Sequence, residues 1–451
     1  MFDALERALR HQRIHGTRSM LREMMRRVRR RLGGTSATAA AIPGIVVDDA
    51  GWVNARELVR KHRQACAPLR LFTIPRADVG RITLVTDSIN RGSLYGGVGT
   101  SLIFAALLAR ARGERLRLLT RTEKPQPGGL QTVLGAYGIA LDHEVEFAFA
   151  PFYDERYEVD AFEDEQFITT SWWTTSATLG AVASGRIVYL LQEDERMFYP
   201  HGDEHLRASQ VMSHPDLRFV VNTRLLFDHL VGSGLANVER NGMWFEPSFP
   251  PAVFRPAADR PPGKRTLFFY ARPNNVRNLF VLGLDVLETA IARGVIDLAT
   301  WDIVFVGKDI PRIRLDDGRY TPQRLENLDW GQYAALAGRT DLALCLMYTP
   351  HPSYPPFDLA ASGAVVVSNR FANKQDLGGY SANILCADAN TEALVAALAD
   401  GARLALDTPA REANFRAGRL GTDWKASFAS VIGRLATASA TTAATAAPPR
   451  D

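Results

Sequence analysis

The chain has 451 residues, of which 46% are hydrophobic and 23% charged, a composition typical of globular proteins. This length predicts two domains, or three, rather than one hydrophobic core. The sequence contains no apolar run of about eighteen residues, which excludes a membrane-spanning helix, and its start lacks the apolar stretch of a secretory signal. The three cysteines are widely separated, which favours a reducing cytoplasm over a disulfide framework and provides no metal-ligand spacing.

The net charge of +4 is concentrated in the first 32 residues. This segment holds ten arginines against Asp3, Glu6 and Glu23, a local charge of +7, so the remaining chain carries about −3. The sequence MMRRVRRRL within it predicts a basic amphipathic helix, which could lie on anionic lipid or bind an acidic partner. A solvated leader is the alternative, and nucleic acid is not expected to bind.

From residue 81 onward, short apolar runs alternate with helical patterns. A small-residue linker at 33–44 follows the basic segment, and residues 45–80 are predicted to be a helical lead-in. Runs such as RITLVTDSI, RLRLLTR, FITTSWW and WDIVFVG predict strands, and the segments after them predict helices. This alternation predicts parallel sheets covered by helices on both faces.

A proline-rich break at 246–265 separates two copies of this pattern, so we predict two consecutive doubly wound α/β domains of the Rossmann-like type. The predicted boundaries are 1–44 for a basic helical extension and its linker, 45–250 and 251–435 for the two domains, and 436–451 for a disordered tail. Ligands of such sheets bind at the carboxyl ends of the strands. Two such domains facing each other would form a cleft for two substrates.

A glycine-rich loop, SINRGSLYGGVGTS at 88–101, is predicted between a strand and a helix. Gly96, Gly97 and Gly99 permit positive φ and close approach of the backbone to a ligand, and the helix that follows offers free N–H groups. The G-G-x-G order differs from the dinucleotide fingerprint G-x-G-x-x-G, so NAD or FAD is not expected. Two interpretations of this segment remain: a loop that faces the cleft and touches a ligand, or a tight turn that binds no ligand.

Basic residues follow two predicted strands of the second domain. In YARPNNVRNLF, Arg272 comes directly after a strand, and Arg277 and Asn278 come where a helix is predicted to begin. Two guanidiniums beside a helix N-terminus can bind a diphosphate. Lys308 in VGKD follows the next strand and could contact a nucleotide. The alternative is a capped helix with solvated arginines.

The stretch HPSYPPFDLAASGAVVVSNRFANKQDL, residues 351–377, begins with three prolines in six residues. The prolines predict a stiff loop, because each fixes φ and restricts the residue before it. His351, Ser353 and Tyr354 lie in that loop, and Asp358 is predicted in the first turn of the helix that follows. A carboxylate held there could accept hydrogen bonds from sugar hydroxyls, or it could serve only as a helix-start residue.

Aromatic and polar residues of the first domain are candidates for a second substrate. Trp172 and Trp173 could stack on a sugar, although tryptophans are more often core residues. The segment QEDERMFYPHGDEH at 192–205 follows a predicted strand and offers Gln192, Asp194 and Tyr199. A solvated loop is the alternative interpretation of this segment.

Two of these motifs resemble elements of the GT-B glycosyltransferases. R-P-N-N-V-R at 272–277 is similar to the Arg-x4-Lys element of the retaining GT-B enzymes, with Arg277 in the place of the lysine. The proline-rich stretch is similar to their Glu-x7-Glu loop and helix, with Asp358 at the second glutamate. Pro350 stands at the position of the first glutamate. The neighbouring His351 could substitute for the carboxylate of that glutamate.

The chain also resembles the bacterial rhamnosyltransferases that build polyrhamnan chains of S-layer glycans and O-antigens. SINRGSLYGGVGTSL, YLLQEDERMFYP, FYARPNNVRNLFVLGLDVL and the stretch 351–377 carry this resemblance, which covers about residues 81–430. It implies the GT-B fold and retaining transfer of a deoxyhexose, such as rhamnose, from a dTDP-sugar to a growing surface glycan. The sequence has no Asp-x-Asp, so neither a metal nor another cofactor is expected beside the nucleotide-sugar.

The resemblance also implies roles for the candidate residues. The first domain would bind a lipid-linked glycan acceptor and the second the nucleotide-sugar, at the cytoplasmic face of a membrane touched by residues 1–32. The implied assignments are Gly96, Gly97 and Asp358 at the reaction centre, Arg272, Arg277 and Asn278 on the donor diphosphate, Lys308, His351, Ser353, Tyr354 and Asp358 on the nucleotide or sugar, and Trp172, Trp173, Gln192, Asp194 and Tyr199 on the acceptor. A sugar-nucleotide epimerase and a non-catalytic binding module are the alternatives, the latter supported by Pro350.

Overall fold

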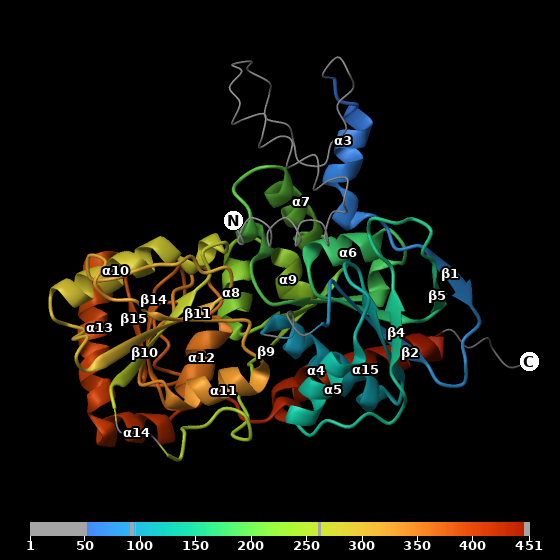
Figure 1. The fold of residues 1–451 in the computed structure, drawn as a ribbon. Coiled ribbons are helices and arrows are strands. Elements are labelled where there is room, and N and C mark those ends of the chain that lie inside the picture. The colour runs from blue at the N-terminus through green and yellow to red at the C-terminus, as the bar shows by residue number, and fades with distance from the viewer. Residues whose placement is uncertain (1–51, 91–93, 95, 260–262, 446–451) are drawn as a thin grey trace, which may run out of the picture. The chain divides into compact units, whose positions relative to one another are not determined.

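The computed structural model describes residues 52–90, 94, 96–259 and 263–445 (Figure 1). By its internal contacts the chain divides into two units, residues 1–64 and 65–451. The predicted basic helix within residues 1–32 and the linker at 33–44 lie outside the described residues.

The segment before residue 81 is only partly helical. Helix α3 (Ala55–His62) begins after Asn54, whose side chain accepts hydrogen bonds from two backbone N–H groups of the first turn, and none of its side chains is buried. A short 3-10 helix, η1, spans Gln64–Cys66. Strand β1 (Leu71–Ile74) then pairs in parallel with β5 (Val159–Phe162). The prediction of a helical lead-in over 45–80 was therefore wrong for β1, because a partner strand distant in sequence stabilises its extended form.

The first large sheet has seven parallel strands in the order β4-β3-β2-β6-β7-β8-β9. Its strands are β2 (Arg81–Thr86), β3 (Arg115–Thr120), β4 (Glu146–Phe149), β6 (Gln166–Thr169), β7 (Ile187–Leu191), β8 (Arg218–Asn222) and β9 (Gly242–Phe245). Every residue of β2, β6 and β7 is buried, as expected for a parallel sheet covered on both faces.

The second large sheet has six parallel strands in the order β12-β11-β10-β13-β14-β15. Its strands are β10 (Arg265–Ala271), β11 (Trp301–Gly307), β12 (Gln323–Glu326), β13 (Leu342–Leu344), β14 (Val365–Asn369) and β15 (Ile384–Ala387). The proline-rich segment lies between β9, the last strand of the first sheet, and β10. We call the parts of the chain built on these two sheets the N-terminal and the C-terminal domain. Two Rossmann-like α/β domains are thus confirmed.

Helices join the strands within each domain. In the N-terminal domain they are α4 (Gly97–Arg112), α5 (Pro127–Ala136), α6 (Trp172–Leu179), η3 (Ser184–Arg186), η4 (Glu195–Phe198), α7 (Asp203–Met212), α8 (Arg224–Gly232) and α9 (Ala236–Asn241). In the C-terminal domain and at the end of the chain they are η5 (Val276–Asn278), α10 (Phe280–Ala292), α11 (Trp330–Arg339), α12 (Tyr354–Ala361), α13 (Thr391–Leu406), α14 (Thr408–Arg416) and α15 (Trp424–Thr445).

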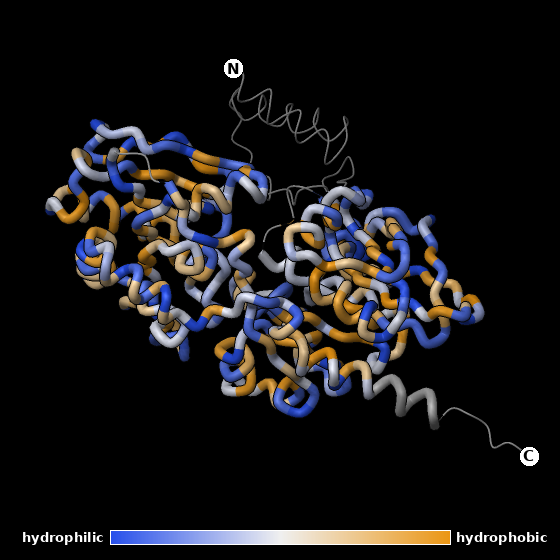
Figure 2. The backbone as a smooth tube through the Cα atoms, turned by 90° about the horizontal axis from the view of Figure 1, so that it is seen from below, coloured by the Kyte–Doolittle hydropathy of each residue, from blue (hydrophilic) through white to orange (hydrophobic). Residues whose placement is uncertain are grey.

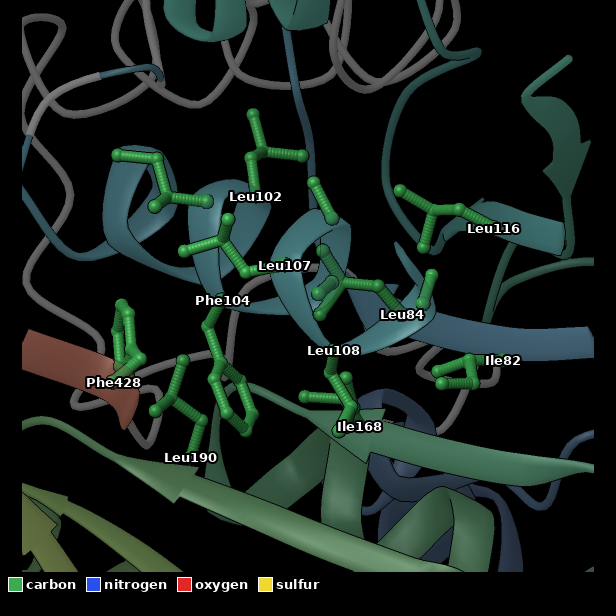
Figure 3. Close-up of a cluster of buried hydrophobic side chains, with 14 of the residues drawn as sticks. Ile82, Leu84, Leu102, Phe104, Leu107, Leu108, Leu116, Ile168, Leu190 and Phe428 are labelled. Carbon is green, nitrogen blue, oxygen red and sulfur yellow. The ribbon is translucent and has the colours of Figure 1, made fainter. Parts of the chain in front are cut away.

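The core of the N-terminal domain lies between α4 and its sheet. Leu102, Phe104 and Leu108 of α4 pack with Leu84 and Ile168 of the sheet (Figure 3). Eleven residues of α4 are buried, so this helix is apolar around most of its surface. Figure 2 shows that hydrophobic segments gather inside each domain, whereas hydrophilic ones lie toward the outside.

The last helix belongs to the first core although it follows the second sheet. Phe428 of α15 packs on Phe104 with ring centroids 5.1 Å apart and on Phe245 at 4.4 Å, and Trp424 and Val431 join the same cluster. Figure 1 shows α15, in red, beside α4. The predicted assignment of residues 424–435 to the C-terminal domain was therefore wrong. The helix continues to Thr445, so the predicted disorder was also wrong for 436–445.

Three local expectations also differ from the structure. The run FITTSWW is a strand only to Thr169, because Ser171 forms a capping box with Thr174 and starts α6 at Trp172. Helix α12 begins at Tyr354, so its prolines lie in the first turn and Asp358 lies in the second turn, not the first. The edge strands β9 and β12 were not predicted, because β12 is mostly polar and the apolar run of β9 is only three residues long.

Candidate active site

A cavity of about 540 Å³ is lined by residues of both domains at the carboxyl ends of their strands. Gln192 and Glu193 follow β7, Arg272 follows β10, and Lys308 follows β11. The structure brings ten of the fifteen candidate residues to this cavity, namely Gly96, Gly97, Gln192, Arg272, Arg277, Lys308, His351, Ser353, Tyr354 and Asp358. Open parallel sheets bind ligands at this edge.

The glycine loop meets the C-terminal domain at close range. Gly96 has φ of +57°, and a Cβ atom on it would lie 3.3 Å from the ring of Tyr354. Gly97 is the first residue of α4, and its carbonyl accepts a hydrogen bond from Nε2 of Gln192 at 2.7 Å. Glycine is required at Gly96 both for its backbone conformation and for the space that the tyrosine occupies.

Tyr354 connects the two domains through its hydroxyl group. This group hydrogen-bonds Thr100 of α4 at 2.5 Å, accepts from Nδ2 of Asn222 at 2.8 Å, and donates to Oε1 of Gln192 at 3.2 Å. Tyr354 starts α12 of the C-terminal domain, whereas its three partners belong to the N-terminal domain. The tyrosine therefore fixes the glycine loop against the proline-rich stretch.

Replacing Gly96 with alanine is expected to lower catalytic efficiency, because the new Cβ must displace Tyr354. Gly113→Ala is the matched control, since Gly113 has a similar φ of +61° but a Cβ atom added there would meet no other atom within 4 Å. Both variants should lose about 1 kcal/mol of stability from the backbone conformation. Only Gly96→Ala should lower kcat/KM, by roughly tenfold, in a transfer assay. Equal activities of the two variants would contradict this role of Gly96.

Three cations line the part of the cavity formed by the C-terminal domain. Nη1 of Arg272 contacts the hydroxyl of Tyr270 at 3.4 Å, and neither Arg272 nor Lys308 forms an ion pair within the described part of the chain. Arg277 is mostly buried, and its guanidinium lies 4.2 Å from the ring centroid of Phe198. Uncompensated positive charge in a cavity suits a phosphate-bearing ligand.

Asn278 does not reach the cavity. It is completely buried, and its Nδ2 donates to the carbonyl of Leu346 at 3.1 Å. Helix α10 begins only at Phe280, after Leu279 with φ of +47°. The side chain of Asn278 thus supports the loop after β13, and binding of a diphosphate at the chain near Asn278 stays a prediction from the sequence.

Glu193 lines the cavity and the charge of Lys374 acts on it, and the sequence analysis missed both residues. Glu193 is 8% exposed, accepts a hydrogen bond from Oγ1 of Thr349 at 2.9 Å, and lies 3.4 Å from Nη1 of Arg277. Lys374 is completely buried, and its Nζ donates to the carbonyl of Met347 at 2.7 Å. Burial raises the pKa of Glu193 to about 7 and lowers that of Lys374 to about 8. A lone lysine and a glutamate beside Gln192 gave little signal in the sequence.

His351 lines the cavity and carries a hydrogen-bond donor that has no protein partner among the described residues. Its Nδ1 accepts the backbone N–H of Ser353 at 3.0 Å, so the proton of the neutral ring lies on Nε2, which is buried without a protein partner. Burial lowers the pKa of His351 to about 3, and the charges of Lys374 and Arg277 lower it further. Ser353 has φ of +72°, a strained conformation for a residue that is not glycine. This loop therefore presents a fixed Nε2–H group.

Asp358 is buried and accepts a hydrogen bond from the hydroxyl of Tyr333 at 3.1 Å. Burial raises its pKa to about 8, and the Tyr333 hydrogen bond only partly offsets this effect. This raised pKa favours the protonated carboxyl group at neutral pH. It can become a carboxylate when ligand hydroxyls donate to it.

Four predicted acceptor residues lie outside the cavity lining. Nε1 of Trp172 donates to the hydroxyl of Tyr199 at 3.2 Å, and Nε1 of Trp173 donates to Asp87 at 3.0 Å. Burial would raise the pKa of Asp194, but hydrogen bonds from Arg196 and His229 lower it to about 2. These contacts organise the loops after β6 and β7. Acceptor binding by these four residues stays a prediction from the sequence, and of the predicted acceptor residues only Gln192 lines the cavity.

The described part of the chain shows no metal-ligand cluster and no helix able to span a membrane. It contains no group of three or more His, Cys, Asp or Glu residues that could hold a metal ion. No helix within the described residues combines the length and the hydropathy that crossing a bilayer requires. Independence from metals stays a prediction.

Solved structures of known proteins share this fold. The chain is similar to HepE of Anabaena in complex with UDP-glucose, with a TM-score of 0.53, 13% identity, and coverage of 80% of this chain and 99% of that one. It is also similar to sucrose-phosphate synthase of Thermosynechococcus elongatus, with a TM-score of 0.51, 13% identity, and coverage of 81% and 100%. Two Rossmann-like domains around such a cavity form the GT-B fold.

The family follows from matches along the sequence. Residues 81–224 match the family described as the WsaF N-terminal domain, and residues 265–399 match the WsaF C-terminal domain. The chain therefore belongs to the WsaF family. It is also 30% identical over 381 residues to the O-antigen biosynthesis protein RfbC of Myxococcus xanthus. This match covers 78% of the chain but only 27% of the length of RfbC.

Proposed function

We propose that the protein transfers a sugar from a nucleotide-sugar to a growing bacterial surface polysaccharide such as an O-antigen. The name of RfbC and the UDP-glucose complex of HepE support this class of reaction. The motifs resembling polyrhamnan-building enzymes favour rhamnose, or another deoxyhexose, carried by dTDP and transferred with retention. The acceptor would be a lipid-linked glycan, approached at the cytoplasmic face of a membrane through residues 1–32.

The observation that carries this proposal is the convergence of Arg272, Arg277 and Lys308 on one cavity opposite the glycine loop. When the bond between the sugar and the diphosphate breaks, negative charge grows on the leaving diphosphate. Fixed guanidinium groups stabilise that charge more in the transition state than in the ground state. In this mechanism the cations act without a metal ion.

Other cavity residues would bind the remaining parts of the donor. The carboxyl of Asp358 suits hydroxyl groups of the ribose or the sugar, and the Nε2–H of His351 suits an oxygen of the sugar. The contact between Gly96 and Tyr354 would close the cavity over the reaction centre and exclude water, so that transfer competes with hydrolysis.

A thermal-shift screen with and without EDTA tests the proposal. dTDP-rhamnose, dTDP-glucose, UDP-glucose and GDP-mannose are compared at equal concentration. A ligand at a hundred times its dissociation constant stabilises the native state by about 2.7 kcal/mol, so a dTDP-sugar should raise the melting temperature by several degrees, with or without EDTA. Absence of a shift with every nucleotide-sugar would overturn the proposed function, and a shift with UDP-sugars alone would overturn the dTDP assignment.

A nucleotide-sugar epimerase is the second candidate, because Glu193, His351 and Asp358 line the same cavity and could move protons. Incubation of the donor in D2O without acceptor separates the two functions. An epimerase that works by removing and returning a proton places deuterium on the sugar, whereas a transferase leaves the sugar unlabelled. The membership in the WsaF family favours the transferase.

A further inference from the structure

Arg277 is held in place by both domains. Its Nε donates to Oδ1 of Asn275 at 3.2 Å within the C-terminal domain. From the N-terminal domain, the ring of Phe198 lies 4.2 Å from the guanidinium, and Oε2 of Glu193 lies 3.4 Å from Nη1. A long arginine side chain loses its conformational freedom in such a setting. The N-terminal domain thus contributes to the position of a cation that serves the C-terminal domain.

Glu193 is almost completely enclosed by this arrangement. Its Oε1 accepts the backbone N–H of Asp194 at 3.1 Å, and its Oε2 accepts the hydroxyl of Thr349. Burial raises its pKa to about 7, whereas the charges of Arg277 and Lys374 lower it. The carboxyl group is therefore balanced between its two protonation states near neutral pH.

The charged and titratable groups around Glu193 come from several segments. Arg277 lies in η5, and Lys374 lies in the turn from Phe371 to Lys374 that follows β14. His351, after β13, is neutral because its pKa is about 3. On the same loop as Glu193, Asp194 pairs with Arg196 and His229, while the buried Glu195 interacts with the charge of Arg277. Arg277 and Lys374 are the cations whose charges act on Glu193.

A diphosphate bound to Arg277 changes this balance. It brings at least two negative charges close to the carboxylate, and like charges at such distances favour the protonated acid. The acid form still fits the site, because its O–H group can donate to a phosphate oxygen, whereas the carboxylate can only accept. Binding of the anion and binding of a proton to Glu193 should therefore support each other.

We propose that Glu193 is a positioning residue that holds Arg277 in place and takes up a proton when a nucleoside diphosphate binds beside Arg277. This inference rests on the proposed function, in which Arg277 binds the donor diphosphate. The proton comes from solvent, and no covalent bond changes. Donor affinity then depends on pH through a residue of the acceptor-side domain.

Isothermal titration calorimetry of the full chain with dTDP and with UDP tests the inference. Titrations between pH 6.5 and 8.5, in buffers of different ionisation enthalpy, count the protons taken up on binding. Each nucleotide has a terminal phosphate that titrates near pH 6, so the deciding quantity is the difference between the wild type and Glu193→Gln. Because burial raises the pKa of Glu193 to about 7, the wild type should take up roughly half a proton more than Glu193→Gln at pH 7.

The direction of the pH dependence follows from the same linkage. The bound state holds more protons on Glu193 than the free state, so affinity should fall as pH rises above about 7, by up to about tenfold per pH unit. Nucleotide affinity of Glu193→Gln should lack this part of the pH dependence. Glu193→Asp keeps a titrating carboxyl group and should restore part of it, which a purely structural role of the side chain would not do.

Glu246→Gln is the matched control. Glu246 is another carboxyl group with a pKa raised by burial, it accepts from Tyr380 and from the backbone of Arg224, and it does not line the cavity. This variant should bind nucleotide with the proton uptake of the wild type. Proton uptake in Glu193→Gln equal to that of the wild type would overturn the inference.

Arg277→Ala separates this inference from the proposed function. If Arg277→Ala binds dTDP and UDP as the wild type does, or if the wild type binds neither, the diphosphate assignment fails and the inference fails with it. If Arg277→Ala weakens binding at least tenfold while Glu193→Gln leaves the proton uptake unchanged, only the inference fails. Weakened binding in Arg277→Ala together with lost uptake in Glu193→Gln supports both.

Discussion

Replacing Arg272 with alanine is expected to lower kcat/KM for the nucleotide-sugar by about 100- to 1,000-fold. Arg272 comes directly after β10, lines the cavity, and forms no ion pair within the described residues, so its charge is available to the donor diphosphate. Removal of one fixed group that stabilises developing negative charge typically has an effect of this size. Steady-state kinetics and the dissociation constant for dTDP measure the loss.

Arg312→Ala provides the control for this variant. Arg312 is exposed, belongs to the same domain, and does not line the cavity. The substitution therefore removes the same charge from the protein without changing the site. Its kinetics should stay within about twofold of the wild type, as expected for a surface substitution. An unchanged dTDP affinity in Arg272→Ala would overturn the assignment of this arginine to the diphosphate.

The largest effect on stability is expected from Glu165→Ala in the N-terminal domain. Glu165 is 1% exposed, and its carboxylate accepts hydrogen bonds from Arg81 at 2.8 Å, from Arg117 at 2.6 Å and from the hydroxyl of Thr83. Burial lowers the pKa of Arg117, and the charge of Glu165 opposes that shift. Removal of the carboxylate leaves Arg117 buried with less compensation, which should cost about 3–5 kcal/mol in the free energy of unfolding.

Asp164→Ala is the neighbouring control. Asp164 pairs with Arg76 at the surface, where both side chains are about half exposed. An exposed pair of this kind contributes about 0–1 kcal/mol, so this variant should melt close to the wild type. Urea unfolding is monitored by circular dichroism, and the first unfolding transitions of the two variants are compared. A loss below about 1 kcal/mol for Glu165→Ala would show that the buried cluster does not stabilise the domain.

The sequence predicted the parallel sheets because their signals are local. Strands such as β2 and β7 are continuous apolar runs, and glycine or proline marks the turns between elements. The edge strand β12 is mostly polar and the apolar run of β9 is only three residues long, so both were missed. The proline-rich stretch was predicted as a loop up to Phe357, but its prolines fit the first turn of α12.

The candidate site was predicted where residues follow strands along the chain. Arg272, Lys308 and Gln192 each come directly after a strand, and all three line the cavity. The tryptophans of α6 and Asp194 were expected there for their residue type, but hydrogen bonds direct them into the loops of the N-terminal domain. Residue type alone does not indicate which way a side chain faces, because packing of neighbouring elements decides it.

The sequence by itself determined two α/β domains, the edge of each sheet at which the cavity lies, and the cations at that edge, because these follow from short-range patterns. Only the tertiary structure decided which groups meet across the domains. Tyr354 bonds Thr100 across 254 positions, and Glu193 accepts a hydrogen bond from Thr349 across 156. Such pairs arise when separate segments pack together, and burial at their contact sets the protonation of Glu193. No local pattern in the sequence records either effect.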